Sequence, residues 1–107
     1  MSGPIKHILM WRLRGETTAE RSAARTKVKT LFEGLQGRID GLPHIEVGVD
    51  VSDVDYACDV VLVSEFADSS ALKAYAIHPE HLRVRERLVD LRIGRFQVDY
   101  PVKEAGT

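Results

Sequence analysis

Alternation of apolar and polar side chains marks four segments of the chain as β-strands. Residues 5–13, 45–51 and 95–100 alternate with a period of two, and residues 59–66 contain the continuous apolar run Val-Val-Leu-Val. Successive side chains of a strand point to opposite faces of a sheet, and a continuous apolar run is typical of a strand covered on both faces. The pattern predicts four strands, with residues 59–66 near the centre of the sheet.

A first helix is predicted between the first two strands. Thr17 and Glu20 have the spacing of a capping box, in which the two side chains satisfy backbone N–H groups at the start of a helix. Apolar residues then recur every three or four positions as far as Ile39, and Gly41 and Pro43 follow. This pattern predicts a helix with one apolar face that ends near residue 41.

A second helical region is predicted between the third and fourth strands. Asp68 is an N-cap candidate for a short helix that includes Tyr75, and Pro79 fits the first turn of a second short helix that runs to about Val89. The first turn tolerates a proline because its missing N–H has no helical partner there in any case. We therefore expect two helical pieces that meet at Pro79.

The order of these elements is β-α-β-β-α-β. It predicts an α+β, ferredoxin-like fold with one four-stranded antiparallel sheet and helices on one face, as a single domain of residues 1–107 with its core between about residues 5 and 100. The first and third strands carry apolar side chains on both faces, although the helices cover only one. We predict that a homodimer through the sheet face buries the other, and a monomer that covers it with a rearranged tail is the alternative.

Composition and charge exclude several classes of function. The chain has 44% hydrophobic and 29% charged residues, and 15 basic against 16 acidic residues give a net charge of −1. This balance is typical of a globular protein and lacks the basic excess of a nucleic-acid binder. Cys58 is the single cysteine, so no internal disulfide can form, and no apolar segment approaches the roughly 18 residues of a membrane span. The sequence predicts a cytoplasmic protein that binds neither nucleic acid nor membrane.

The clearest chemical signal lies in the second helical region. Tyr75, His78 and His81 are spaced three residues apart, close to one helical turn, in the string Tyr-Ala-Ile-His-Pro-Glu-His. Together with Lys-His in the first strand, Phe-Ala-Asp before the helical region and Val-Asp-Tyr in the last strand, this string resembles the stress-responsive A/B barrel (Dabb) family. The resemblance spans roughly residues 5 to 100, which is nearly the whole chain.

The resemblance implies a dimeric α+β barrel built from ferredoxin-like monomers. The activities of the family are divided between stress-associated proteins of unclear chemistry and a branch of polyketide cyclases that close a linear chain by aldol condensation. In that branch a tyrosine and a histidine carry catalysis, and the matching residues here are Tyr75 and His81. His7 and His78 match further histidines of the pocket and are the candidate substrate-binding residues. The resemblance implies no metal and no organic cofactor.

Acid–base chemistry explains these residue types. Aldol closure needs a base that removes a proton α to a carbonyl, and histidine titrates near neutral pH, so we expect His81 to be the base. Tyr75 is expected to donate its phenolic proton toward the carbonyl oxygen, where negative charge develops. The expected ligand is a small, largely apolar organic molecule held between the helices and the sheet.

Structural roles are the alternative for each candidate residue. A histidine on a helix can bond a backbone carbonyl, a histidine on an apolar strand face is often a hydrogen-bonded core residue, and a tyrosine can simply bury its ring. The protein would then be a non-enzymatic, stress-associated or ligand-binding homodimer. A void of about 300 Å³ or more beside Tyr75 and His81 favours an enzyme, whereas a solid interior there favours the structural alternative. The arginines between residues 83 and 95 alternate with acidic residues, a pattern typical of a solvated surface.

Overall fold

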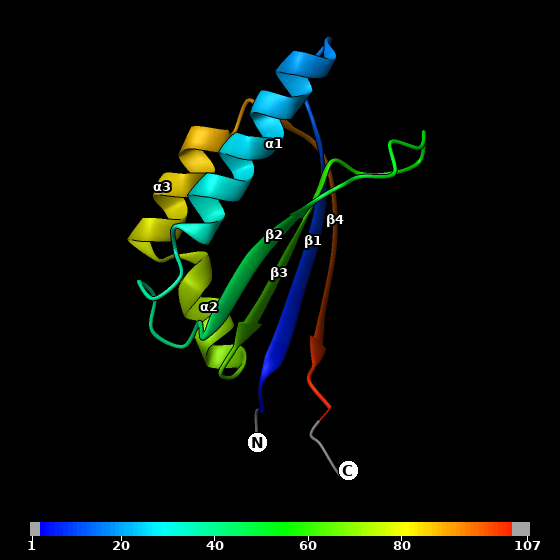
Figure 1. Cartoon of the computed structure of the whole chain (residues 1–107). Coiled ribbons are helices and arrows are strands. Elements are labelled where there is room, and N and C mark those ends of the chain that lie inside the picture. The colour runs from blue at the N-terminus through cyan, green and yellow to red at the C-terminus, as the bar shows by residue number, and fades with distance from the viewer. Residues whose placement is uncertain (1–2, 104–107) are drawn as a thin grey trace.

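Four antiparallel strands form the sheet of the computed structural model, which describes residues 3–103 (Figure 1). Their spatial order is β2 (His44–Val49), β3 (Val60–Phe66), β1 (Ile5–Leu13) and β4 (Arg92–Pro101). The helices are α1 (Thr18–Glu33), α2 (Ser69–Ala76) and α3 (Pro79–Leu88). This arrangement confirms the predicted ferredoxin-like α+β fold, with the second helical region divided into two pieces at Pro79.

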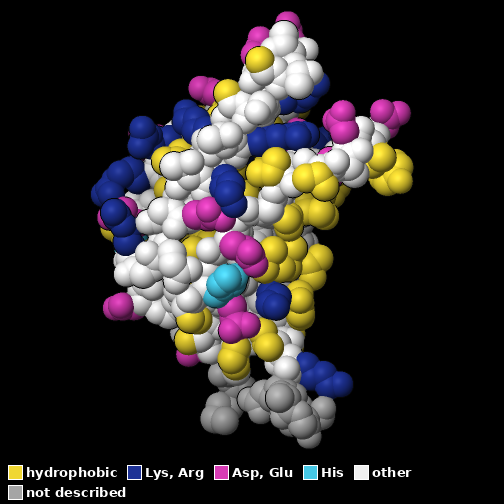
Figure 2. All heavy atoms as spheres, in the orientation of Figure 1, with side chains coloured by type: hydrophobic (Ala, Val, Ile, Leu, Met, Phe, Trp, Pro, Cys, Tyr) yellow, Lys and Arg dark blue, Asp and Glu magenta, His cyan; other side chains and the backbone are white. Residues whose placement is uncertain are grey.

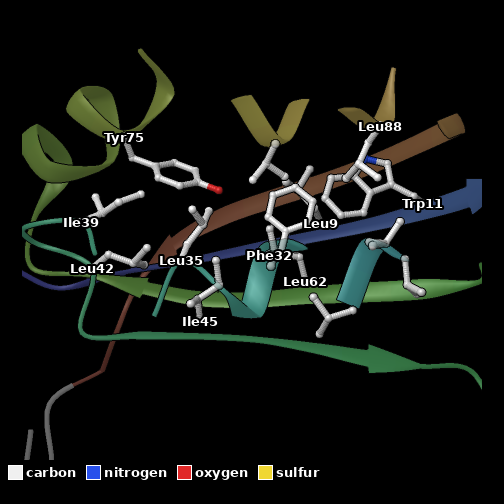
Figure 3. Packing of buried hydrophobic residues seen from close by; sticks show 14 of the residues in the cluster. Leu9, Trp11, Phe32, Leu35, Ile39, Leu42, Ile45, Leu62, Tyr75 and Leu88 are labelled. Carbon is white, nitrogen blue, oxygen red and sulfur yellow. The ribbon is translucent and has the colours of Figure 1, made fainter. Parts of the chain in front are cut away.

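The helices pack on one face of the sheet, and the core lies between the two layers (Figure 1). Figure 3 shows side chains from both layers meeting there: Trp11 from β1 stacks on Phe32 from α1 with ring centroids 5.2 Å apart. Leu62 from the central strand β3 is fully buried in the same layer. No helix within residues 3–103 is long and apolar enough to cross a membrane.

The start of α1 agrees with the prediction. Thr17 is the N-cap, and its hydroxyl oxygen accepts a hydrogen bond from the Glu20 N–H at 3.1 Å. The Glu20 carboxylate accepts in turn from the N–H of Glu16, at 3.2 Å, instead of from Thr17. Two backbone N–H groups at the helix start are therefore satisfied, and one of them belongs to Glu16 instead of Thr17.

The end of α1 differs from the prediction, because the helix stops at Glu33 and a series of turns follows. Gly37 has a φ of 79°, in the left-handed region that glycine adopts without steric cost and that a right-handed helix cannot contain. Leu35 and Ile39 are still buried, because the turns carry them to the core. Their helical spacing correctly indicated burial, and the prediction of a helix through residue 41 is wrong.

Two strand boundaries also differ. β2 ends at Val49 instead of residue 51, and Val51 is 97% exposed in the long loop that projects from the sheet before β3 (Figure 1). β4 begins at Arg92 instead of residue 95, because its pairing with β1 continues as far as Leu13. The earlier start of β4 places an additional arginine next to the core.

The second face of the sheet has no cover among the described residues. Its apolar side chains include Met10, Phe96 and Val98, which are 41%, 54% and 62% exposed. Figure 2 shows hydrophobic side chains gathered along the side of the molecule that lies away from the helices. The sheet therefore carries apolar side chains on both faces, as predicted, and its own helices cover only one of them.

Candidate active site

Tyr75 lies at the centre of the candidate site. It belongs to α2, which begins after Asp68, whose carboxylate accepts a hydrogen bond from the Ala71 N–H at 2.8 Å. The Tyr75 side chain points from the helix into the space above the sheet and is almost fully buried (Figure 3). Its hydroxyl oxygen has no hydrogen-bond partner among the described residues. Burial raises the pKa of Tyr75 above its usual value, so the hydroxyl keeps its proton.

The break between α2 and α3 brings His81 against Tyr75. The chain resumes its helix at Pro79, and the His81 ring stacks on the Tyr75 ring with centroids 3.9 Å apart. His81 Nδ1 lies 3.0 Å from the backbone oxygen of Tyr75, in the last turn of α2. This contact places the proton on Nδ1 and leaves Nε2 as an acceptor. Burial lowers the pKa of His81 to about 4, so the imidazole is neutral near pH 7.

His7 approaches the same tyrosine from β1. It is 5% exposed, and its Nδ1 contacts the carboxylate of Asp99, which lies directly opposite on β4. The His7 ring lies edge-on to Tyr75 and to Phe66, with centroids 6.3 Å and 5.9 Å away. Because an ionised carboxylate only accepts hydrogen bonds, the proton of neutral His7 lies on Nδ1 and Nε2 keeps a lone pair.

These side chains border a cavity of about 270 Å³ between the helices and the sheet. Its apolar wall consists of Leu9, Trp11, Phe32 and Leu72. Ligand sites commonly start at about 300 Å³, so this cavity is slightly smaller than that range and has room only for a small organic molecule. The interior beside Tyr75 and His81 is therefore open. Among residues 3–103, no three histidine, cysteine or acidic side chains are grouped so that they could hold a metal ion.

His78 does not line this cavity. It is the N-cap of α3, and its Nδ1 accepts a hydrogen bond from the Glu80 N–H at 3.1 Å. Of the four residues predicted for the site, the structure brings Tyr75, His81 and His7 together and leaves His78 at the helix start. His78 therefore caps the start of α3, the helix that carries His81 against Tyr75.

Three arginines stand on the rim of the cavity: Arg85 from α3, and Arg92 and Arg95 from β4. The interpretation of this segment as a solvated surface agrees with the exposure of Arg85 and Arg95, whereas Arg92 is half-buried. Half-buried Arg92 lies over the ring of Trp11, with its guanidinium carbon 5.1 Å from the ring centroid. Burial and the nearby charges of Arg85 and Arg95 lower the pKa of Arg92. The cavity mouth is strongly cationic.

Asp99 and the rim arginines are the site residues that sequence reasoning missed. Arg95, Gln97 and Asp99 form the polar half of an alternating strand, the half that usually faces water. The register turns this half toward the helices, because Asp99 lies opposite His7 and Arg95 lies opposite Trp11. A ferredoxin-like order places the first and last strands side by side. Pairing these two strands in the sequence could therefore have shown that Asp99 and Arg95 lie on the same face as His7 and Trp11.

Comparison with known proteins decides the family. The family model for the Stress responsive A/B Barrel Domain (Dabb) matches residues 5–102. The chain belongs to the Dabb family. An uncharacterised protein of Streptomyces coelicolor is 30% identical to it over 77 residues, which make up 72% of this chain and 78% of that protein.

Solved structures confirm the fold. A dimeric protein of unknown function with a ferredoxin-like fold, from Bacteroides fragilis, is 31% identical and has a TM-score of 0.83, over 94% of this chain and 97% of that one. A Dabb family protein from Mesorhizobium loti is 27% identical with a TM-score of 0.69, over 95% of this chain and 99% of that one. These relatives establish the architecture and leave the reaction to be argued from the site.

Proposed function

We propose that the cavity is the active site of a lyase, cyclase or isomerase that removes a proton next to a carbonyl group of a small organic molecule. The observation that carries this proposal is Tyr75, whose ring lies beside two imidazoles and borders the cavity, and whose buried hydroxyl has no partner among the described residues. Nearly all buried hydroxyl groups in proteins are hydrogen-bonded. A bound carbonyl oxygen is the partner that this hydroxyl can take.

Tyr75 is the hydrogen-bond donor of the proposed reaction. Its raised pKa keeps the proton on the hydroxyl, so the group can only help by donating to the substrate oxygen or by accepting from a donor. When the proton leaves the carbon, the electron pair of the C–H bond moves toward the carbonyl oxygen. A preorganised donor in a site with little water stabilises the charge that develops there.

His7 is the base that the geometry favours. The Asp99 carboxylate holds the proton of His7 on Nδ1, leaves the lone pair on Nε2 and stabilises the imidazolium that forms when Nε2 takes a proton. The enolate can then attack a second carbonyl, expel a leaving group or be protonated at another carbon. His7 returns its proton in the same cycle, so the reaction needs no other acid.

His81 receives a different role from the one that the family resemblance suggests. Its pKa of about 4 makes it a weak base, and the nearby Arg85 and Arg92 oppose its protonation. A neutral imidazole with a free Nε2 is suited to accept a hydrogen bond from a hydroxyl or enol of the substrate. We therefore propose that His81 positions the substrate and that His7 moves the proton.

Deuterium exchange tests this function. The probes are 5-oxohexanoate and its methyl ester, whose protons next to the ketone exchange slowly in D₂O and are followed by proton NMR. We expect the wild-type protein to accelerate exchange, His7→Gln to lower the rate about 100-fold, and His81→Gln to lower it less. His44→Gln is the matched control, because His44 is exposed on β2, lies outside the cavity and pairs with Glu46. Exchange at the buffer rate with the wild-type protein and both probes contradicts the proposed function.

We also propose that the chain forms a homodimer through the open face of the sheet. The Bacteroides fragilis relative is described as dimeric, and the apolar side chains of β1 and β4 on this face include Met10, Phe96 and Val98. A second copy of the same face buries them by two-fold symmetry.

The single cysteine, Cys58, is a free thiol, which supports a reducing compartment such as the cytoplasm.

A further inference from the structure

The inner face of β4 is polar and exposed, although it lies beside the core strand β1. Arg95 and Gln97 lie opposite Trp11 and Leu9, two buried core residues, in the β1–β4 register. Alternation normally places apolar side chains on the inner face of such a strand and polar ones outside. Here the outer face carries the apolar residues, and the inner face forms a polar wall of the cavity.

This wall and the helices opposite supply an excess of positive charge. Four cationic residues line the cavity, Lys73, Arg85, Arg92 and Arg95, and the carboxylate among its lining residues, Asp99, is in contact with His7. Within residues 3–103, no carboxylate forms an ion pair with any of these four residues. Ion pairs do hold other cations of the chain, namely Arg25, Lys29 and Arg83. The excess is therefore local, since the whole chain has a net charge of −1.

Arg92 is the best-placed of these cations. Its guanidinium lies over the Trp11 ring, and the side chain is half-buried, so both contacts restrict its position before any ligand arrives. A partly buried cation with other cations beside it and no carboxylate in contact is unfavourable. A ligand anion relieves this repulsion and can form two parallel hydrogen bonds with a guanidinium.

The cationic rim and the proposed chemistry lie in one cavity. Arg85 and Arg92 are close enough to Tyr75 and His81 for their charges to act on both groups. The apolar wall of Leu9 and Leu72 also lines this cavity. A ligand that contacts the arginines, the apolar wall and Tyr75 together has an anionic end, a short apolar middle and a carbonyl group.

We propose that the substrate of this site is a small keto acid, whose carboxylate binds Arg92 and Arg85 while its ketone oxygen reaches the Tyr75 hydroxyl. The inference rests on the proposed function, because it names the substrate class of the same cavity. The carboxylate fixes one end of the molecule, so that the carbon next to the ketone lies within reach of His7. The two guanidinium charges also favour the enolate that forms.

Binding of the two probes tests this inference independently of turnover. Chemical-shift titration of the 15N-labelled full chain gives the dissociation constants of 5-oxohexanoate and of its uncharged methyl ester. We expect the acid to bind at least about tenfold more tightly than the ester, and added NaCl to weaken only the acid. Equal affinity for acid and ester overturns the inference.

Single arginine variants locate the anion site. Arg92→Gln is expected to bring the two dissociation constants within about twofold of each other, and Arg85→Gln to lower the preference severalfold. Arg85 lies exposed on α3, so its variant keeps the test valid if Arg92→Gln does not fold. Arg87→Gln is the matched control on the same helix, because Arg87 lies outside the cavity, and it should keep the full preference. An unchanged preference in both Arg92→Gln and Arg85→Gln overturns the inference.

Competition and exchange separate the remaining outcomes. Acetate should displace 5-oxohexanoate, whereas displacement by inorganic phosphate alone overturns the assignment of a carboxylate. Arginine-dependent binding of the acid without any deuterium exchange supports the anion site and contradicts the proposed function. Equal exchange of acid and ester, with no preference in binding, supports the proposed function and overturns the anion site.

Discussion

At the scale of single residues, the unpartnered Tyr75 hydroxyl costs the folded state free energy. A buried hydroxyl without a hydrogen bond is typically unfavourable by about 1–3 kcal/mol, and phenylalanine keeps the ring contacts with His81 and Phe66. We predict that Tyr75→Phe leaves the free energy of unfolding unchanged or raises it by about 1 kcal/mol. Urea denaturation measures this, with Tyr56→Phe, an exposed loop position, as control. A loss of stability would show that the hydroxyl is already well bonded in the free protein.

The low pKa of His81 makes stability depend on pH. In the folded protein His81 stays neutral down to about pH 4, whereas in the unfolded chain it takes up a proton near pH 6.5. Protonation therefore favours the unfolded chain, and the contribution of neutral His81 is complete above about pH 6.5 and decreases toward pH 4. We predict that the stability of wild type relative to His81→Gln falls over this range. A difference between the two proteins that is constant from pH 7 to pH 4 contradicts the assigned pKa.

Residue types and spacing were enough to select Tyr75, His81 and His7, which the structure places around one cavity, since the family resemblance rests on them. They were not enough to assign roles. Whether a histidine pairs with a carboxylate or with a backbone oxygen depends on contacts across the sheet and across a helix break, as in His7 with Asp99 and His81 with Tyr75. Such contacts set the tautomer of each ring, and no local sequence pattern contains them.

At the scale of elements, the apolar pattern correctly predicted four strands, the two helical regions and the break at Pro79. It failed at the end of α1, because periodicity reports which residues are buried, while the backbone path depended on Gly37. It also left the charged inner face of β4 unassigned, since the face that a strand presents follows from its neighbour in the sheet. Burial was therefore easier to predict than backbone path or strand orientation.

Asp59, which directly precedes β3, connects that strand to β1 and α1. Its carboxylate accepts hydrogen bonds from the Leu13 N–H at the end of β1, at 2.7 Å, and from Arg25 of α1, at 3.0 Å. We predict that Asp59→Ala lowers the free energy of unfolding by about 3 kcal/mol, because Arg25 and the strand N–H lose a largely buried partner. Urea denaturation at matched protein concentration measures the loss. Asp55→Ala, in the exposed loop, should change stability by less than about 0.5 kcal/mol, and an equal effect of both changes contradicts this role.

At the scale of the whole molecule, the uncovered sheet face decides the assembly. We predict that Val98→Lys yields particles with the mass of one chain in sedimentation velocity, because it places a charge in the middle of the proposed interface. Wild type should sediment as two chains. Val89→Lys is the control, because Val89 is equally exposed but follows α3, away from the sheet face, and this variant should remain dimeric. Wild-type protein that sediments as a single chain at all concentrations contradicts the dimer.

The proposed function depends on one group, the Tyr75 hydroxyl, which we propose binds the oxygen of a carbonyl compound in the cavity. The most direct test is the rate at which Tyr75→Phe exchanges the protons next to the ketone of 5-oxohexanoate in D₂O. We predict a rate about 100-fold below that of wild type, in a protein at least as stable. A rate equal to that of wild type would show that the hydroxyl takes no part in the chemistry.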